Sequence, residues 1–155
     1  MGSEGITRRF ALWLLGALWA GLAVADQPAN TGPLDLSAWH GQVVYVDFWA
    51  SWCVPCKQSF PWMNSMHRQY GKDGLVIVAV NMDQVRGDAD AFLQKYPAEF
   101  KVHFDPEGQL APRFKVRGMP TSALLGRDGK VLLIHEGFKS KDADDLEQAI
   151  RKALH

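Results

Sequence analysis

Residues 43–56 of this chain read Val43-Val44-Tyr45-Val46-Asp47-Phe48-Trp49-Ala50-Ser51-Trp52-Cys53-Val54-Pro55-Cys56, and this stretch decides its fold. Its first half is β-branched and aromatic except at Asp47, which is typical of a buried β-strand. The two cysteines follow where the strand should give way to a helix that extends to about Tyr70. Pro61 lies inside that helix and should kink it, because proline removes a backbone donor. The stretch therefore predicts a strand–helix junction that carries a pair of thiols.

The segments that follow predict an α/β chain. A second β-branched run at 75–80 comes after the helix, and a strand, a helix and a strand in this order form a parallel pair with a right-handed crossover. The remaining predicted elements are, in order, a helix at 88–96 capped by Asp88, a strand at 102–104, a helical turn near 109–114, strands at 121–125 and 131–135 joined by a hairpin, and a helix at 142–153. Together they predict a mixed central sheet flanked by helices.

The overall composition limits the classes of function. The chain has 155 residues, of which 47% are apolar and 22% are charged, as expected for one globular domain. Its 17 basic and 17 acidic side chains give no net charge, which argues against a general nucleic-acid binder. Two cysteines can form neither a disulfide-rich scaffold nor a four-cysteine zinc site. We expect a monomer that binds no nucleic acid.

The N-terminal segment has the pattern of a secretory signal peptide. Arg8 and Arg9 precede an uncharged run at 10–25, which ends in the cleavage pattern Ala23-Val24-Ala25. That run is shorter than the roughly 20 residues a bilayer span needs, so cleavage after Ala25 is favoured over a retained inner-membrane anchor. Export predicts a periplasmic domain at 26–155, beginning with an extended leader, whose thiols face an oxidising compartment.

The two cysteines carry the chemistry. A thiol at the N-terminus of a helix loses its proton more easily, because free N–H groups and the helix dipole favour an anion, and the thiolate is the nucleophile. We expect Cys53 at that position and Cys56 one turn into the helix, within disulfide distance. Pro55 fits the first helical turn. A static bridge would close too small a loop to add much stability, and the five histidines do not cluster as metal ligands, so no metal site is predicted.

Two motifs show a family resemblance. Residues 46–57, with Pro61 beyond them, resemble the active-site segment of thioredoxins, and Arg117-Gly118-Met119-Pro120-Thr121 resembles their cis-proline loop. The likeness covers about residues 34–155. An added helix and strand between the two motifs, together with the export segment, make the chain similar to periplasmic TlpA/ResA-type thioredoxins, which are mostly reductases. The resemblance implies a thioredoxin-like fold with a helix–strand insertion between its βαβ and ββα halves.

The motifs also suggest roles for single residues. Cys53 would attack a client disulfide and Cys56 would resolve the mixed disulfide. Asp47, ionisable within an apolar strand, should be buried with a raised pKa and accept the Cys56 proton through water. Thioredoxin has a lysine near this aspartate, and the matching position here is Ala79. A solvent-facing Asp47 is the alternative.

The second motif contributes to the client site. The resemblance makes Pro120 a cis-proline, which would leave the Met119 backbone free to pair with a client strand. Trp52 would form an apolar shelf beside the nucleophile, and Pro55 and Thr121 complete the expected client-binding set. The acidic residue that cytochrome-c-maturation members carry directly after this motif is absent.

These features predict an exported thiol–disulfide oxidoreductase that reduces protein disulfides and has no cofactor beyond its own disulfide. The same chemistry could run as an oxidase or isomerase, because sequence does not set the potential. A Cu(I)-delivery module that uses the same pair is a different class, since thiolates suit Cu(I). If the chain is a reductase, the resemblance implies a membrane electron donor of the DsbD/CcdA kind.

Overall fold

The computed structural model describes residues 34–155, and its centre is a single five-stranded sheet. The strands are β1 (Val43–Trp49), β2 (Leu75–Asn81), β3 (Lys101–Phe104), β4 (Thr121–Leu125) and β5 (Val131–Glu136). They lie in the order β3-β2-β1-β4-β5. β1 is parallel to β2, and β2 to β3, whereas β4 is antiparallel to both β1 and β5. The predicted mixed sheet is confirmed.

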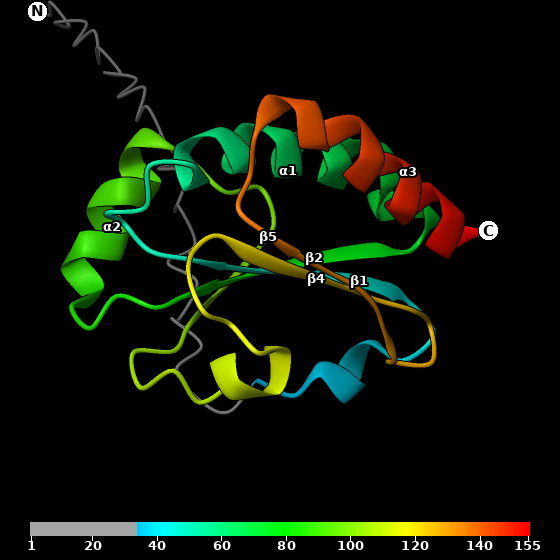
Figure 1. Ribbon diagram of the computed structural model, residues 1–155, viewed down its shortest axis with the longest axis horizontal. Helices are drawn as coiled ribbons and strands as arrows, with labels where there is room; N and C mark the ends of the chain where they lie inside the picture. The colour runs from blue at the N-terminus through cyan, green and yellow to red at the C-terminus, as the bar shows by residue number, and fades with distance from the viewer. Residues whose placement is uncertain (1–33) are drawn as a thin grey trace, which may run out of the picture.

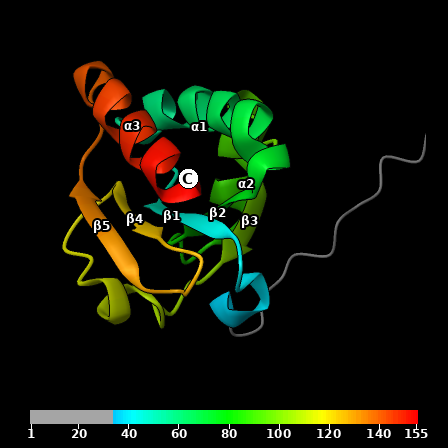
Figure 2. The same ribbon diagram turned by 90° about the vertical axis from the view of Figure 1, so that its right-hand side faces the viewer.

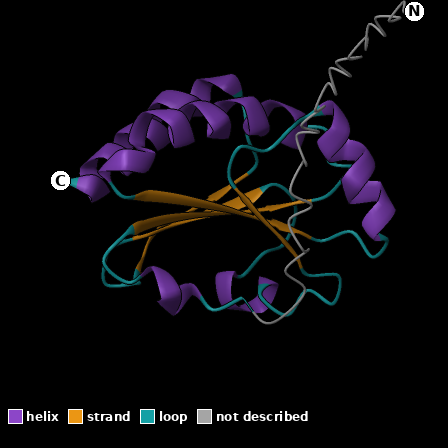
Figure 3. Cartoon of the chain, turned by 180° about the vertical axis from the view of Figure 1, so that it is seen from behind, coloured by secondary structure: helices purple, strands orange, loops and turns teal. Residues whose placement is uncertain are grey.

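The sheet lies between two unequal layers. Its α-helices are α1 (Cys56–Tyr70), α2 (Arg86–Lys95) and α3 (Ala143–Leu154), and all three lie on one side of the sheet (Figures 1 and 2). Short 3₁₀ helices cover the opposite side (Figure 3), namely η1 (Leu36–Trp39) and η3 (Ala111–Phe114). Two more, η2 (Gly71–Asp73) and η4 (Ser140–Asp142), follow α1 and precede α3. The α/β class with flanking helices is confirmed.

β1 is the middle strand of the sheet, and all seven of its residues are buried. Successive side chains of a strand point to opposite faces. Tyr45 and Trp49 belong to the apolar cluster that also contains both cysteines, whereas Val46 and Phe48 belong to the cluster on the other face. Since Asp47 alternates with Val46 and Phe48, its side chain lies on the same face as the cysteines.

The insertion is part of the main core. Phe92 of α2 packs on Trp49 at a ring-centroid distance of 4.8 Å and on Phe60 of α1 at 5.0 Å. Trp49 and Phe60 also meet edge to face at 4.9 Å. Three elements therefore share one aromatic cluster beneath the disulfide-bearing segment, and offset or edge-on aromatic contacts of this kind add to the stability that burial itself provides.

The helix boundaries correct two predictions. The first helix begins at Cys56 and not at Cys53, because the Cys53 N–H donates to the Ala50 carbonyl and closes a turn before the helix starts. α2 begins at Arg86, with Val85 in an extended conformation before it, so Asp88 lies in the first turn and does not cap the helix. An acidic residue in that position still interacts favourably with the helix dipole.

The N-terminal predictions are tested only in part. The leader predicted as extended contains a 3₁₀ helix at 36–39, where the Asp35 side chain accepts the Ser37 N–H. The predicted signal peptide at 1–25 lies outside the described residues. Within 34–155, none of the helices has the length and apolar character that a membrane span requires.

Candidate active site

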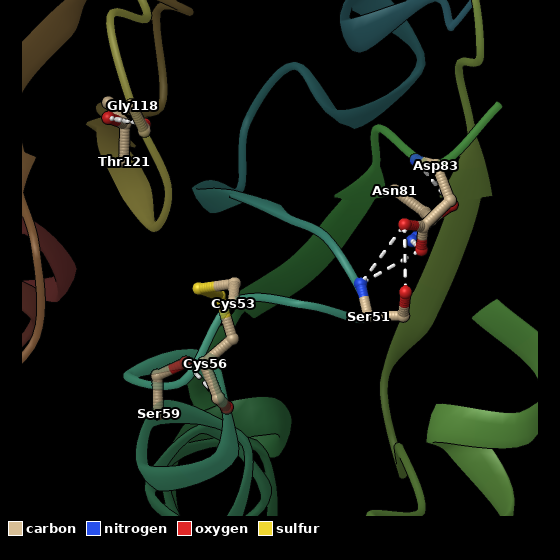
Figure 4. Close-up of a disulfide and its surroundings, with 8 residues drawn as sticks. All are labelled: Ser51, Cys53, Cys56, Ser59, Asn81, Asp83, Gly118 and Thr121. Atoms are coloured by element: carbon tan, nitrogen blue, oxygen red, sulfur yellow. Dashed lines mark hydrogen bonds between the residues drawn. A yellow bond between two sulfur atoms is a disulfide. The ribbon is translucent and has the colours of Figure 1, made fainter. Parts of the chain in front are cut away.

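Cys53 and Cys56 form a disulfide with their Cα atoms 5.4 Å apart. Cys56 is the first residue of α1, and Cys53 lies in the turn that leads into the helix (Figure 4). The spacing of the two cysteines thus allows the bridge that the sequence predicted. Because α1 has no acidic side chain in its first turn, the partial positive charge of its N-terminus acts unopposed on the preceding turn.

Both cysteines are buried, but the residues around them differ in exposure. Cys56 is completely buried, whereas Cys53 is 2% exposed. Trp52 and Val54 on either side of Cys53 are 68% and 65% exposed, which is unusual for large apolar side chains. Cys53 therefore lies between two exposed apolar side chains, whereas Cys56 lies at the start of α1 and in the core. Trp52 is exposed beside Cys53, and its role as an apolar shelf for a client stays a prediction.

Asp47 is buried on the disulfide face of the sheet. It is 2% exposed, and its Oδ2 has no hydrogen-bond partner in the structure. Burial raises the pKa of Asp47 well above its ordinary value, because the charged form loses its hydration. In the sheet register, Asp47 lies opposite Ala79 on β2 and opposite Ser122 on β4. The position expected to match the thioredoxin lysine therefore holds Ala79.

Hydroxyl groups lie near Asp47. Tyr45 is on the same face of β1, two residues away, and its pKa is raised by burial and by the charge of Asp47. The Ser122 side chain is a hydrogen-bond partner of the Tyr45 hydroxyl and opposes that shift. The sequence analysis did not identify Tyr45 and Ser122, although the two-residue period of β1 places Tyr45 and Asp47 on one face.

The second predicted motif forms a tight loop before β4. The Met119–Pro120 peptide bond is cis, as the resemblance predicted. Pro120 is buried and Met119 is half-buried. Thr121 is only 1% exposed, and its hydroxyl donates to the Gly118 carbonyl at 2.7 Å (Figure 4). The Thr121 side chain therefore braces the loop, and any contact of Thr121 with a client would have to use its backbone.

A third segment reaches the cysteine turn and was missed in the sequence analysis. The carboxylate of Asp83, which follows β2, accepts hydrogen bonds from the backbone and the hydroxyl of Ser51 (Figure 4). Asn81, the last residue of β2, binds the same carboxylate through its side-chain amide. One signal was available: polar residues directly after two adjacent parallel strands lie at the same edge of the sheet.

Pro55, the remaining member of the expected client-binding set, is half-buried at the start of α1. Within residues 34–155, no group of three or more His, Cys, Asp or Glu side chains is arranged to hold a metal ion.

Comparison with known proteins identifies the class. Residues 23–150 match the Redoxin family, and the chain belongs to it. Over 119 residues it is 31% identical to the thiol-disulfide oxidoreductase ResA of Bacillus thuringiensis subsp. konkukian, which covers 77% of this chain and 68% of that relative. The structure resembles that of a putative thiol:disulfide interchange protein DsbE from Chlorobium tepidum, with a TM-score of 0.78 and 55% identity over 83% of this chain and 91% of the other.

A third relative is the exposed lipoprotein thioredoxin Etrx1 of Streptococcus pneumoniae, which is 32% identical, has a TM-score of 0.64 and covers 75% of this chain and 88% of that one. The fold is therefore thioredoxin-like. This chain is an enzyme, a thiol–disulfide oxidoreductase related to ResA and DsbE, with Cys53 and Cys56 as its redox pair. In thiol–disulfide exchange, the dithiol form of such a pair can reduce a disulfide and the disulfide form can oxidise a dithiol.

Proposed function

We propose that this chain is exported and reduces protein disulfides through the Cys53–Cys56 pair. The observation that carries the proposal is where each cysteine lies. Cys53 is in a turn between two exposed apolar side chains, whereas Cys56 is fully buried as the first residue of α1. We therefore assign the contact with a client protein to Cys53 and the reaction with the neighbouring sulfur to Cys56.

The proposed reaction has two exchanges. The Cys53 thiolate attacks one sulfur of the client disulfide, so that the client S–S bond breaks and its other sulfur leaves as a thiolate and takes up a proton. The Cys56 thiolate then attacks the Cys53 sulfur, which releases the second client thiolate and forms the Cys53–Cys56 disulfide. The client gains two electrons and two protons, and the enzyme loses them.

Asp47 is the proposed acceptor of the Cys56 proton. Its carboxyl group is buried on the face of the sheet that α1 covers, and its pKa is raised by burial. A base with a pKa closer to neutral is better suited to exchange a proton with a thiol than an ordinary aspartate. Ala79 offers no ammonium group here, so Tyr45 and Ser122 supply the neighbouring polar groups.

The proposed client surface surrounds Cys53. Trp52 and Val54 give it apolar area, and Pro55 extends this area toward α1. Met119, before the cis Pro120, offers a backbone that an extended client segment can pair with. An apolar centre with a strand-pairing edge suits an unfolded or loop segment of a protein.

The compartment and the electron supply are also part of the proposal. The signal pattern at 1–25 supports export to the periplasm, and the Etrx1 relative is described as exposed. An extracytoplasmic reductase must receive electrons from inside the cell, because its surroundings are oxidising. A membrane donor of the DsbD/CcdA type would return the pair to the dithiol form.

The first test is the reduction potential of residues 26–155 in thiol buffers, followed by tryptophan fluorescence. Trp49 and Trp52 lie close to Cys53 in the sequence, so the two redox states should differ in emission. We expect a value close to that of thioredoxin, about −270 mV. A value near that of the oxidant DsbA, about −120 mV, would contradict the reductase direction and favour oxidation or isomerisation.

The second test separates the two cysteines. Cys53→Ser should abolish insulin reduction, and Cys56→Ser should accumulate a mixed disulfide that is visible on a non-reducing gel. Copper measured after purification of the wild-type chain serves as the control for the metal-delivery alternative. Insulin reduction that survives Cys53→Ser, or a tight equimolar load of copper, would contradict the proposal.

A further inference from the structure

The turn that presents Cys53 is held from outside by a carboxylate. The Cys53 N–H donates to the Ala50 carbonyl at 3.0 Å, so residues 50–53 form a hydrogen-bonded turn with Ser51 as its second residue. The Ser51 N–H donates to Asp83 at 2.9 Å and 3.2 Å, and the Ser51 hydroxyl donates to Asp83 at 3.0 Å (Figure 4). The turn has no other hydrogen bond for this N–H among the described residues.

Asp83 is itself fixed in place. The Asn81 side-chain amide donates to its Oδ2 at 2.8 Å, and the Asp83 N–H donates back to the Asn81 side-chain oxygen at 3.1 Å. Asn81 is fully buried and Asp83 is 5% exposed. Between them, the Met82 N–H donates to the Trp49 carbonyl at 2.9 Å, which ties the ends of β2 and β1 together. The carboxylate therefore belongs to the rigid edge of the sheet and not to a mobile loop.

We propose that Asp83, braced by Asn81, is a positioning residue for thiol–disulfide exchange. It keeps the 50–53 turn in one conformation, so that the Cys53 sulfur stays in front of the N-terminus of α1. The same contact keeps Trp52, the third residue of the turn, directed toward the client. The statement about Trp52 rests on the proposed function, because it assumes a protein client. The statement about the Cys53 sulfur does not, because it concerns only the reactivity of that thiol.

The hydrogen-bond donors around residue 83 explain why an aspartate suits this position. A buried charge is costly unless donors satisfy it, and this one accepts from the Ser51 backbone, the Ser51 hydroxyl and the Asn81 amide. Bonds to an ionised acceptor are shorter and stronger than neutral ones. An asparagine at 83 would keep one oxygen acceptor but turn an amide toward the remaining donors, so it should hold the turn less well.

The chain provides a matched control in Asp105. This residue follows β3 as Asp83 follows β2, is 6% exposed, and accepts the backbone N–H groups of Gln109 and Leu110 at 3.0 Å each. It therefore holds a turn in the same way at the same edge of the sheet, but the turn carries no cysteine. Loss of either carboxylate should reduce stability, whereas only Asp83 should affect the redox pair.

The test uses the reduced full chain with Asp83→Asn, Asp83→Ala, Ser51→Ala and Asp105→Ala. Alkylation of Cys53 by iodoacetamide across pH reports its thiolate pKa, because a one-unit rise lowers the thiolate fraction about tenfold below that pKa. We expect Asp83→Ala to slow alkylation at pH 7 at least about fivefold, with Asp83→Asn and Ser51→Ala in between. Asp105→Ala should alkylate within about twofold of the wild type, although it is less stable.

Insulin reduction adds a second readout. The Asp83 variants should raise KM for insulin more than Asp105→Ala does, because they also release Trp52. Ser51→Ala keeps both backbone hydrogen bonds, so it should fold even where Asp83→Ala does not. The proposal is overturned if the folded Asp83 variants alkylate at the wild-type rate, or if they alkylate faster, as the loss of a negative charge alone would produce. If the wild type fails to reduce insulin but alkylation depends on Asp83, the client proposal fails and the positioning role stands.

Discussion

Asp47 and Trp52 are opposite extremes of exposure at the residue scale. The Asp47 carboxyl is enclosed on the disulfide face of β1 and has an unpartnered oxygen, whereas the Trp52 ring is mostly in solvent beside Cys53. Burying an ionisable group without a counter-charge lowers the stability of the folded state. An exposed indole does not contribute the stabilisation that burial of its apolar surface would give. Neither the buried Asp47 nor the exposed Trp52 stabilises the folded state. Both side chains therefore indicate positions that serve chemistry or binding at some cost in stability.

The cost of burying Asp47 should appear in the pH dependence of stability. The folded state holds the proton of this carboxyl more tightly than the unfolded state, so its contribution is full at low pH and is lost as pH rises through the raised pKa. Asp47→Asn should therefore become progressively more stable than the wild type above about pH 4, by up to about 1.4 kcal/mol per pH unit until the folded pKa is passed. Urea unfolding of both oxidised proteins at several pH values measures this difference. A difference independent of pH would refute the assignment.

The exposure of Trp52 leads to a separate prediction. Trp52→Ala removes an aromatic group from the proposed client surface without opening the core, so the free energy of unfolding should change little. KM for insulin should rise about tenfold or more, because buried tryptophans often dominate protein interfaces. Reduction of a small aromatic disulfide, which needs little surface, serves as the control. An equal loss for both substrates would point to altered Cys53 chemistry in place of client binding.

At the scale of elements, α2 is a structural part of the domain and not an appendage. Phe92 joins it to Trp49 of β1 and Phe60 of α1, the helix that begins with Cys56. The loop before α2 carries Asp83, which holds the turn before Cys53. The inserted segment thus contacts the end of β1 through Trp49 and the helix α1 through Phe60. The edge of the sheet, α1 and α2 together surround the segment that carries the disulfide.

Truncation of Phe92 measures how strongly α2 is held. Phe92 is 5% exposed, and replacing a buried phenylalanine with alanine costs about 3–5 kcal/mol of unfolding free energy. Phe92→Ala should lose an amount in this range in urea unfolding monitored by circular dichroism. Val85→Ala, at an apolar residue that is 61% exposed just before the same helix, should change stability by less than about 0.5 kcal/mol. Similar losses for the two variants would mean that α2 packs only loosely.

Over the whole molecule, redox state and folding stability are linked. The disulfide lies at the start of α1, next to the edge of the sheet where β1 and β2 end. A folded pair with a lower potential than the same pair in the unfolded chain makes the oxidised protein the more stable form, by about 1.4 kcal/mol for each 30 mV. This thermodynamic cycle connects the proposed direction of electron flow to an unfolding measurement.

For a reductase, the oxidised chain should therefore unfold at a higher urea concentration than the reduced chain. The difference in unfolding free energy should match the difference between the potentials of the folded and the unfolded pair. Cys53→Ser, which forms no bridge, is the control and should be insensitive to reductant. A reduced chain that is the more stable form would indicate an oxidant, since DsbA owes its high potential to a stabilised reduced form.

Local sequence patterns were sufficient for the strands and for the redox pair, but not for the starts of α1 and α2. β1 and β4 have the predicted bounds, because unbroken β-branched and aromatic runs specify a buried strand without help from distant residues. The link between the two cysteines was also foreseen, since a spacing of three residues holds two side chains close together in any helical start. Asp47 could be proposed as buried because its neighbours in the strand are apolar.

Tertiary structure decided what surrounds these residues. Ser51 and Asp83 are 32 positions apart, and their hydrogen bonds exist because β1 and β2 pair in register. α1 begins at Cys56, after the hydrogen-bonded turn at 50–53, and the Thr121 hydroxyl is buried against the Gly118 carbonyl. Periodicity along the chain reports only which face a side chain points to. Which groups meet on that face depends on strand order and register, and these are properties of the folded sheet.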